Sequence, residues 1–249
     1  MQRIFNFPTL AIISSAFLVA ALCLMESTRH IFPFWIIARG SFVMDTLFHE
    51  LGHSIFGWLF GFPNIPMIFT IFQSDKMGGM ALMLGHLLIL QFAAVIALGY
   101  ACYYIRGSFL YIPLVTFTVI IAIISASGYG QLFIDYMGHG SATLVGGFFL
   151  YRAWANIAPR GKLERWLNAY FGAYLTLGNT HFAYKLITDS YFFSEYTNEV
   201  EFIGHRDFVK VAEQLAISVN SVAIFTIILG LATIAISAIL AAIYSEDSY

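Results

Sequence analysis

Long apolar stretches, separated by short polar or glycine- and proline-containing segments, make up most of this chain. Each stretch is close to the roughly 20 residues that an α-helix needs to cross the hydrocarbon core of a bilayer. The pattern therefore predicts an all-α polytopic membrane protein with six or seven transmembrane helices. The expected helices lie at residues 7–25, 41–62, 80–104, 108–127, between Gly130 and Pro159, and at 166–187 and 214–244.

The segment after the second expected helix does not fit a spanning helix. Residues 63–79 contain two prolines and a Gly78-Gly79 pair, which interrupt helical hydrogen bonding. The central part, residues 67–72, is apolar and rich in residues that favour β-strands. We expect a short re-entrant or β-hairpin segment here. The polar and mostly acidic residues 188–210 are expected to form a loop.

Composition supports a membrane protein and excludes other classes. Hydrophobic residues make up 59% of the chain and charged residues 10%, whereas a soluble domain has about 45–50% and 25%. A length of 249 residues suits a single membrane-embedded domain, residues 1–249, within the lipid bilayer. There is no block of basic residues that would indicate nucleic acid, and the sequence does not indicate an oligomeric state.

Basic residues in the expected connections predict an orientation. If seven helices cross the membrane, alternate connections share a face. One face then collects Arg29, Arg39, Arg106, Arg160, Lys162 and Arg165. Basic residues in short loops favour the cytoplasm. We therefore expect this face in the cytoplasm and residues 188–210 on the outside.

Two histidines and a glutamate interrupt the second apolar stretch. His49-Glu50-Leu51-Gly52-His53 places the imidazoles one helical turn apart, on one face, where they could share a metal ion. Glu50 lies beside that face, where its carboxylate can accept a proton from a water bound to the ion. Ionisable groups at membrane depth are costly unless they meet a partner, and a metal ion is a partner for both imidazoles. The alternative is that the histidines are only hydrogen-bonded to neighbouring helices.

The residues around this motif resemble a known family. The segment Phe48-His-Glu-Leu-Gly-His-Ser-Ile-Phe-Gly57, followed by Gly78-Gly79, is similar to the site-2-protease or M50 group of membrane metallopeptidases. More narrowly, it resembles the compact M50B-like branch, which has no PDZ domain. The resemblance implies a multi-pass protease of the bacterial inner (plasma) membrane that hydrolyses membrane-spanning protein substrates in regulated intramembrane proteolysis. It also implies one Zn²⁺ ion, held by His49, His53 and a carboxylate on a later helix, with Glu50 as the base.

The third ligand is ambiguous in the sequence. The Leu-Asp-Gly segment that the family usually carries is absent. Asp207 lies in residues 204–218, which resemble the Asp-x-x-x-(Leu/Val)-Ala segment before the last helix of M50B-like chains, and we favour it. Asp135 and His139, one helical turn apart, are the alternative. Asp207 could instead cap the final helix, and Asp135 with His139 could form a polar patch against another helix.

Two functions outside proteolysis are open at this point. The missing Leu-Asp-Gly segment allows a non-proteolytic M50-like membrane protein that binds a metal or a partner. Intramembrane histidines also suit an ion transporter, although the internal repeat that many transporters contain is absent from the sequence. Glycines in the fifth stretch predict close contacts between helices; they are Gly138, Gly140, Gly146 and Gly147.

Overall fold

The computed structural model describes residues 6–70, 77–83, 85–108, 111–157, 160–198 and 206–244. Within these residues the chain forms nine α-helices and one two-stranded antiparallel sheet. The helices are α1 (Phe7–Leu24), α2 (Phe34–Leu59), α3 (Leu88–Tyr104), α4 (Tyr111–Ser127), α5 (Gly130–Trp154), α6 (Lys162–Thr188), α7 (Ser190–Asn198), α8 (Asp207–Leu215) and α9 (Val219–Tyr244), and the strands are β1 (Asn64–Thr70) and β2 (Met77–Met83). The helical class and the β-hairpin after the helix with the histidine motif are confirmed.

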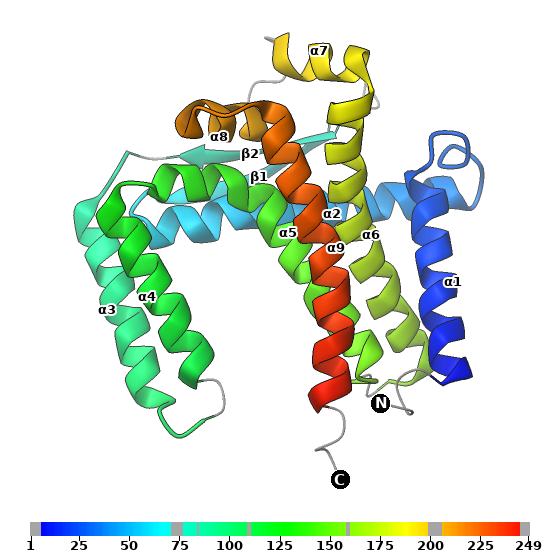
Figure 1. The fold of residues 1–249 in the computed structure, drawn as a ribbon, viewed down its shortest axis with the longest axis horizontal. Helices are drawn as coiled ribbons and strands as arrows, with labels where there is room; N and C mark the ends of the chain where they lie inside the picture. The colour runs from blue at the N-terminus through cyan, green and yellow to red at the C-terminus, as the bar shows by residue number, and fades with distance from the viewer. Residues whose placement is uncertain are drawn as a thin grey trace.

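Most of the long helices run along one direction, whereas α2 lies across them. In Figure 1, α1, α3, α4, α6 and α9 run up and down, and α2 runs nearly at right angles to them close to one end. Helix α5 begins beside the end of α4, follows α2 and then turns down beside α6 and α9. The hairpin, α7 and α8 lie at the same end as α2 (Figure 1). The helix with the motif is therefore present, but it crosses the bundle instead of running along it.

Because α2 crosses the bundle, the loops between helices lie together in a different grouping from the one that the sequence predicts. The end of α1 and both ends of α2 lie at the end of the molecule that carries α7 and α8 (Figure 1). The end of α3 and the start of α6 lie at the opposite end, as do the start of α1 and the end of α9. The expected grouping of Arg29 and Arg39 with the basic residues near α3 and α6 is therefore wrong. The reason is that α2 does not carry the chain from one end of the bundle to the other.

The hairpin takes residues that we expected in the third helix. Strands β1 and β2 pair antiparallel, with Met67 opposite Met80 and Asn64 opposite Met83. Residues 77–83 therefore belong to the sheet, and α3 begins at Leu88, later than the expected residue 80. Pairing with β1 gives hydrogen-bond partners to the backbone groups on one edge of this segment, in place of those that a helix would supply. The expected strand at residues 67–72 lies only partly within the described residues.

The region after α6 contains two further corrections. Residues 190–198 of the expected loop form α7, because the Asp189 carboxylate accepts hydrogen bonds from the backbone N of Tyr191 and Phe192 at 3.1 and 3.0 Å. The expected last helix is broken at Ala216, whose left-handed φ of 53° ends α8. Helix α9 begins only at Val219. Residues 199–205 lie outside the described part of the chain.

Among the residues that the structure describes, two helices, α1 and α9, are long and apolar enough to cross a membrane. Helix α1 begins where Asn6 Oδ1 accepts a hydrogen bond from the backbone N of Thr9 at 3.0 Å, which satisfies a free donor of the first turn. Helices α3 and α4 are also apolar but have 17 residues each. Ile89 and Ile112 on them are 81% and 73% exposed. Apolar surface of this extent is unusual on a monomer in water.

Helix α6 lies at the centre of the packing. Alanines on α1 and α6, Ala16, Ala20, Ala169 and Ala173, are fully buried in one apolar cluster. A second cluster joins α8 to α6 and α9 through Phe208, Ala183 and Ala223. At Gly146 an added Cβ would lie 2.8 Å from Thr176 Cγ2, so the expected close helix contact at this glycine is confirmed. This packing places the start of α8 over α2 and α5.

Candidate metal centre

Side chains from two distant helices, α2 and α8, meet at one point. His49 Nε2 lies 3.0 Å from His53 Nε2 and 3.1 Å from Asp207 Oδ2. His53 Nε2 lies 3.2 Å from the same carboxylate oxygen. Helical spacing places the two imidazoles on one face of α2, and the packing of α8 brings Asp207 to them. The structure thus brings together His49, His53 and the third ligand that the sequence favours.

The size of this triangle fits a single metal ion. Ligand atoms on a tetrahedral zinc ion, with bonds of about 2.0–2.1 Å, are separated by about 3.3 Å. The sides of the triangle measure 3.0, 3.1 and 3.2 Å. Two imidazole nitrogens and a carboxylate oxygen are also ligands that zinc commonly takes in proteins. Both the spacing and the chemistry of the three atoms therefore fit the ion.

A hydrogen bond to α5 orients one of the two imidazoles. His53 Nδ1 lies 2.7 Å from the backbone oxygen of Ile134. A carbonyl oxygen only accepts, so the hydrogen is on Nδ1, and the lone pair of a neutral ring is on Nε2. Metal-binding histidines are usually held by an outer hydrogen bond of this kind. His53 is buried, with 8% of its surface exposed, so few other orientations are open to it.

Asp207 is the most deeply buried member of the triangle, at 1% exposure. Burial opposes ionisation, but the imidazoles of His53 and His49 outweigh it and hold the pKa of the Asp207 carboxyl well below its ordinary value. Lys210, one turn later on α8, places its Nζ 3.6 Å from Asp207 Oδ1. Asp207 begins α8 without capping it through its side chain, because its carboxylate faces the histidines.

Glu50 lies next to the triangle and is also buried, at 2% exposure. Its carboxylate is close enough to His49, His53 and Asp207 to interact electrostatically with all three. A carboxylate kept from bulk water beside a metal site is suited to accept a proton from a water at the ion. The structure therefore places the Glu50 carboxylate beside the triangle, as the spacing of the motif predicts.

Helices α2 and α5 approach each other at Gly138, one of the glycines that the sequence singles out. A Cβ at this position would lie 2.5 Å from His53 Nε2 and 2.6 Å from His49 Cε1. The imidazoles therefore occupy space that only a glycine leaves free. One turn along α5, Ser141 Oγ donates a hydrogen bond to the Phe48 carbonyl at 2.8 Å, which fixes the two helices against each other.

Of the two alternative ligands, His139 joins the site and Asp135 does not. The ligand atoms of His49, His139 and Asp207 lie within 4.8 Å of one another, and these residues form a group that could hold a metal ion. The rings of His139 and His49 lie edge to face, with centroids 4.7 Å apart. Asp135 instead accepts hydrogen bonds from Gln131 Nε2 at 3.1 Å and from Gln214 Nε2 at 2.7 Å. Asp135 thus links α5 to the end of α8.

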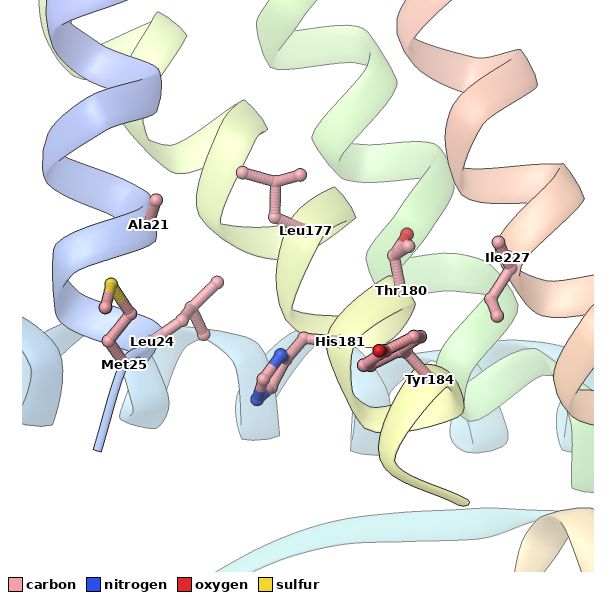
Figure 2. Close-up of a pocket in the computed structure, with 8 residues that line it drawn as sticks. All are labelled: Ala21, Leu24, Met25, Leu177, Thr180, His181, Tyr184 and Ile227. Atoms are coloured by element: carbon pink, nitrogen blue, oxygen red, sulfur yellow. The ribbon is translucent and has the colours of Figure 1, made fainter. Parts of the chain in front are cut away.

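A hollow of about 340 Å³ lies beside α6 and is separate from the candidate metal centre. Figure 2 shows it between α1, α6 and α9, lined by Ala21, Leu24, Met25, Leu177, Thr180, His181, Tyr184 and Ile227. Of these side chains only His181 has an imidazole, and none has a carboxylate. The hollow therefore lacks the donor set of the site formed by α2, α5 and α8.

Two groups that hold the site were not foreseen from the sequence. The Ile134 carbonyl orients His53, and Asn179 Oδ1 lies 2.7 Å from His139 Nδ1. A backbone oxygen has no signal in a sequence, and Asn179, one of two asparagines in α6, belongs to no motif. No protein-family model, curated protein or solved structure matches this chain.

Proposed function

We propose that the protein is an intramembrane zinc metalloprotease that hydrolyses peptide bonds of membrane-spanning protein substrates. The observation that carries the proposal is the triangle of His49 Nε2, His53 Nε2 and Asp207 Oδ2, with sides of 3.0–3.2 Å and a buried Glu50 beside it. In this proposal the three residues hold one Zn²⁺ ion. The resemblance of residues 48–57 to the M50 group supports the same reaction.

A zinc ion at this site would polarise the scissile carbonyl and activate a water for attack. Glu50 Oε accepts a proton from that water and passes it to the leaving amine nitrogen as the C–N bond breaks. Ile134 keeps the His53 ring turned toward the ion through the 2.7 Å hydrogen bond. Glu50 and Asp207 are buried, at 2% and 1% exposure, so their carboxylates are kept from bulk water.

In this proposal α1, α3, α4, α5, α6 and α9 cross the bilayer. The length and apolar character of α1 and α9, together with the exposed apolar side chains of α3 and α4, support it. Helix α2 then lies along the membrane near one face, with the hairpin and α8 over it (Figure 1). The start of α1 and the end of α9 share the other face, in the plasma membrane of a bacterium.

The β1–β2 hairpin is the proposed docking edge for the substrate. Its first residue, Asn64, donates a hydrogen bond from Nδ2 to the His53 carbonyl at 3.2 Å, and its own carbonyl accepts one from Trp58 Nε1 at 2.9 Å. The hairpin is therefore anchored on the helix that carries the motif. A transmembrane substrate must unwind before cleavage, and pairing with a strand would satisfy the amides that it exposes.

The proposal is tested with the full chain in proteoliposomes that contain zinc and a single-span protein substrate. Glu50→Gln should abolish cleavage while one zinc ion stays bound, because the amide cannot accept the proton but the three ligands are unchanged. Glu213→Gln on the exposed face of α8 is the matched control and should cleave at the wild-type rate. Full cleavage by the Glu50 variant would refute Glu50 as the general base and, with it, the proposed zinc-protease mechanism at this site.

A second function is favoured by His139. With His139 next to His49 and Asp207, the site offers a fourth protein ligand, and ions with four protein ligands are usually structural. The protein would then be a non-proteolytic, metal-binding membrane protein. In that case zinc removal lowers the melting temperature, but single-span substrates of varied sequence stay intact in the wild type as in the Glu50 variant.

A further inference from the structure

Asn179 is a buried amide on α6, next to the candidate metal centre. It is 5% exposed. Its Nδ2 donates a hydrogen bond to the Leu175 carbonyl at 2.9 Å, one turn earlier on the same helix. Its Oδ1 lies 2.7 Å from His139 Nδ1, on the neighbouring helix α5. The amide therefore connects the backbone of α6 to a residue of the candidate site.

The first of these hydrogen bonds determines the direction of the second. Because the Leu175 carbonyl only accepts, the NH₂ group of Asn179 must face it, and the amide oxygen must face His139. An amide oxygen cannot donate, so His139 carries a hydrogen on Nδ1. In the neutral ring the lone pair is then on Nε2.

The ring of His139 is held in this position by aromatic neighbours. Phe182 stacks on it with centroids 5.1 Å apart and an angle of 19°, and Phe208 meets it with centroids 4.6 Å apart. With Nδ1 bound to Asn179, Nε2 is the nitrogen that remains for the group formed with His49 and Asp207.

We propose that Asn179 is a positioning residue of the metal centre. It holds His139 in the Nδ1–H form, so that the Nε2 lone pair is available as a further nitrogen donor beside His49, His53 and Asp207, which is the fourth ligand on which the second function depends. The proposal rests on the ion of the proposed function but not on peptide hydrolysis. It also gives His139 the same kind of support that Ile134 gives His53, from a different helix.

The test compares Asn179→Leu with Asn179→Asp in the full chain in detergent micelles. The side-chain ¹⁵N shifts of His139, identified by their loss in His139→Gln, report which nitrogen carries the hydrogen in zinc-free protein. Wild type and Asn179→Asp should show Nδ1–H, because both offer an oxygen acceptor, whereas Asn179→Leu should lose it. Zinc affinity should fall about 10–100-fold in Asn179→Leu, as for other outer partners of metal ligands. Asn179→Asp should recover most of that loss.

Asn168→Leu is the matched control, since Asn168 is a buried asparagine of the same helix, also 5% exposed. It should leave the His139 shifts and zinc affinity unchanged. Nε2–H in wild-type His139 would overturn the proposal, even if Asn179→Leu failed to fold. A folded Asn179→Leu variant that binds zinc with wild-type affinity would also overturn the proposal. A protein that shows the expected shifts and affinities but cleaves no substrate would refute the protease and leave the role of Asn179 intact.

Discussion

The pair of helices α3 and α4 contains no charged residue, whereas the helices that meet at the junction of α2, α5 and α8 each carry at least two, and the two regions differ in what they bury. In α3 the only buried residue is Cys102, and in α4 the buried residues are Ile121 and Ile124. The junction buries the charged or titratable residues Glu50, His53, Asp135 and Asp207. In a chain with 10% charged residues, such burial is costly and needs compensating partners.

This difference predicts which substitutions the molecule tolerates. At the junction, His53, Asp135 and Asp207 each have a polar partner at 2.7–3.2 Å, so a small change of shape or charge alters the geometry of the site. Along α3 and α4, large side chains face outward, so one apolar side chain can replace another. Zinc affinity and melting temperature, measured for variants of both regions, separate the two cases.

The largest effect is expected for Asp207→Asn. The amide has the shape of the carboxylate but lacks its charge, so the ion loses a ligand and the imidazoles lose their partner at 3.1 and 3.2 Å. Zinc affinity should fall more than about 100-fold, since loss of an outer partner alone costs 10–100-fold. Competition with a zinc chelator measures it. Asp189→Asn, which affects only the start of α7, is the control, and equal affinities in the two variants would exclude Asp207 as a ligand.

The next effect is expected for Gly138→Ala, which adds a single methyl group to α5. That carbon would lie 2.5 Å from His53 Nε2, so the imidazole must move by about 1 Å to reach an ordinary contact distance. Metal–ligand distances tolerate only about 0.2 Å, and we expect zinc affinity to fall at least 10-fold. Gly99→Ala on α3, where an added Cβ meets nothing within 4 Å, should leave affinity unchanged. A similar result for both variants would mean that the histidines can move without cost.

A smaller effect is expected for Asp135→Asn, which leaves one oxygen acceptor for two glutamine donors. The bond from Gln214 Nε2, at 2.7 Å, ties the end of α8 to α5, and a hydrogen bond to a charged group contributes about 1.5–3 kcal/mol. Hydrogen exchange of α8 should become faster, and zinc affinity should fall several-fold because α8 carries Asp207. Glu213→Gln on the same helix is the control. Unchanged exchange in α8 would show that Asp135 does not anchor it.

The parts of this site that sequence could predict are those that depend on local spacing. The separation of His49 and His53 predicts one helical face, and Pro63 with Gly78 predicts a break followed by a hairpin. Asp207 followed from a resemblance of the segment around it, because no spacing relates residue 207 to residue 49. Which of Asp135 and His139 faces the histidines depends on how α5 is rotated, and the sequence left both open.

The direction of α2 could not be predicted for a physical reason. Hydrophobic length indicates whether a helix can cross a membrane, but the angle between helices depends on the contacts that they make. Helix α2 carries Arg39, Asp45 and Glu50, and it turns its motif toward α5 and α8 rather than toward the surface of the molecule. Asn179 is a similar case, since its role depends on a hydrogen bond between α5 and α6 that exists only in the folded chain.

The smallest effect is expected for Ile96→Ala on α3, and it is the variant that tests the comparison most directly. Ile96 is 70% exposed, so its truncation removes few contacts with the rest of the chain. The free energy of unfolding should change by less than about 0.5 kcal/mol, and zinc affinity should stay within about twofold of the wild type. At the junction even the single methyl group of Gly138→Ala would lie 2.5 Å from His53 Nε2, so we do not expect an equally small effect there. A tenfold loss of zinc affinity in Ile96→Ala would mean that α3 shapes the metal centre from a distance, and that the two regions are not independent.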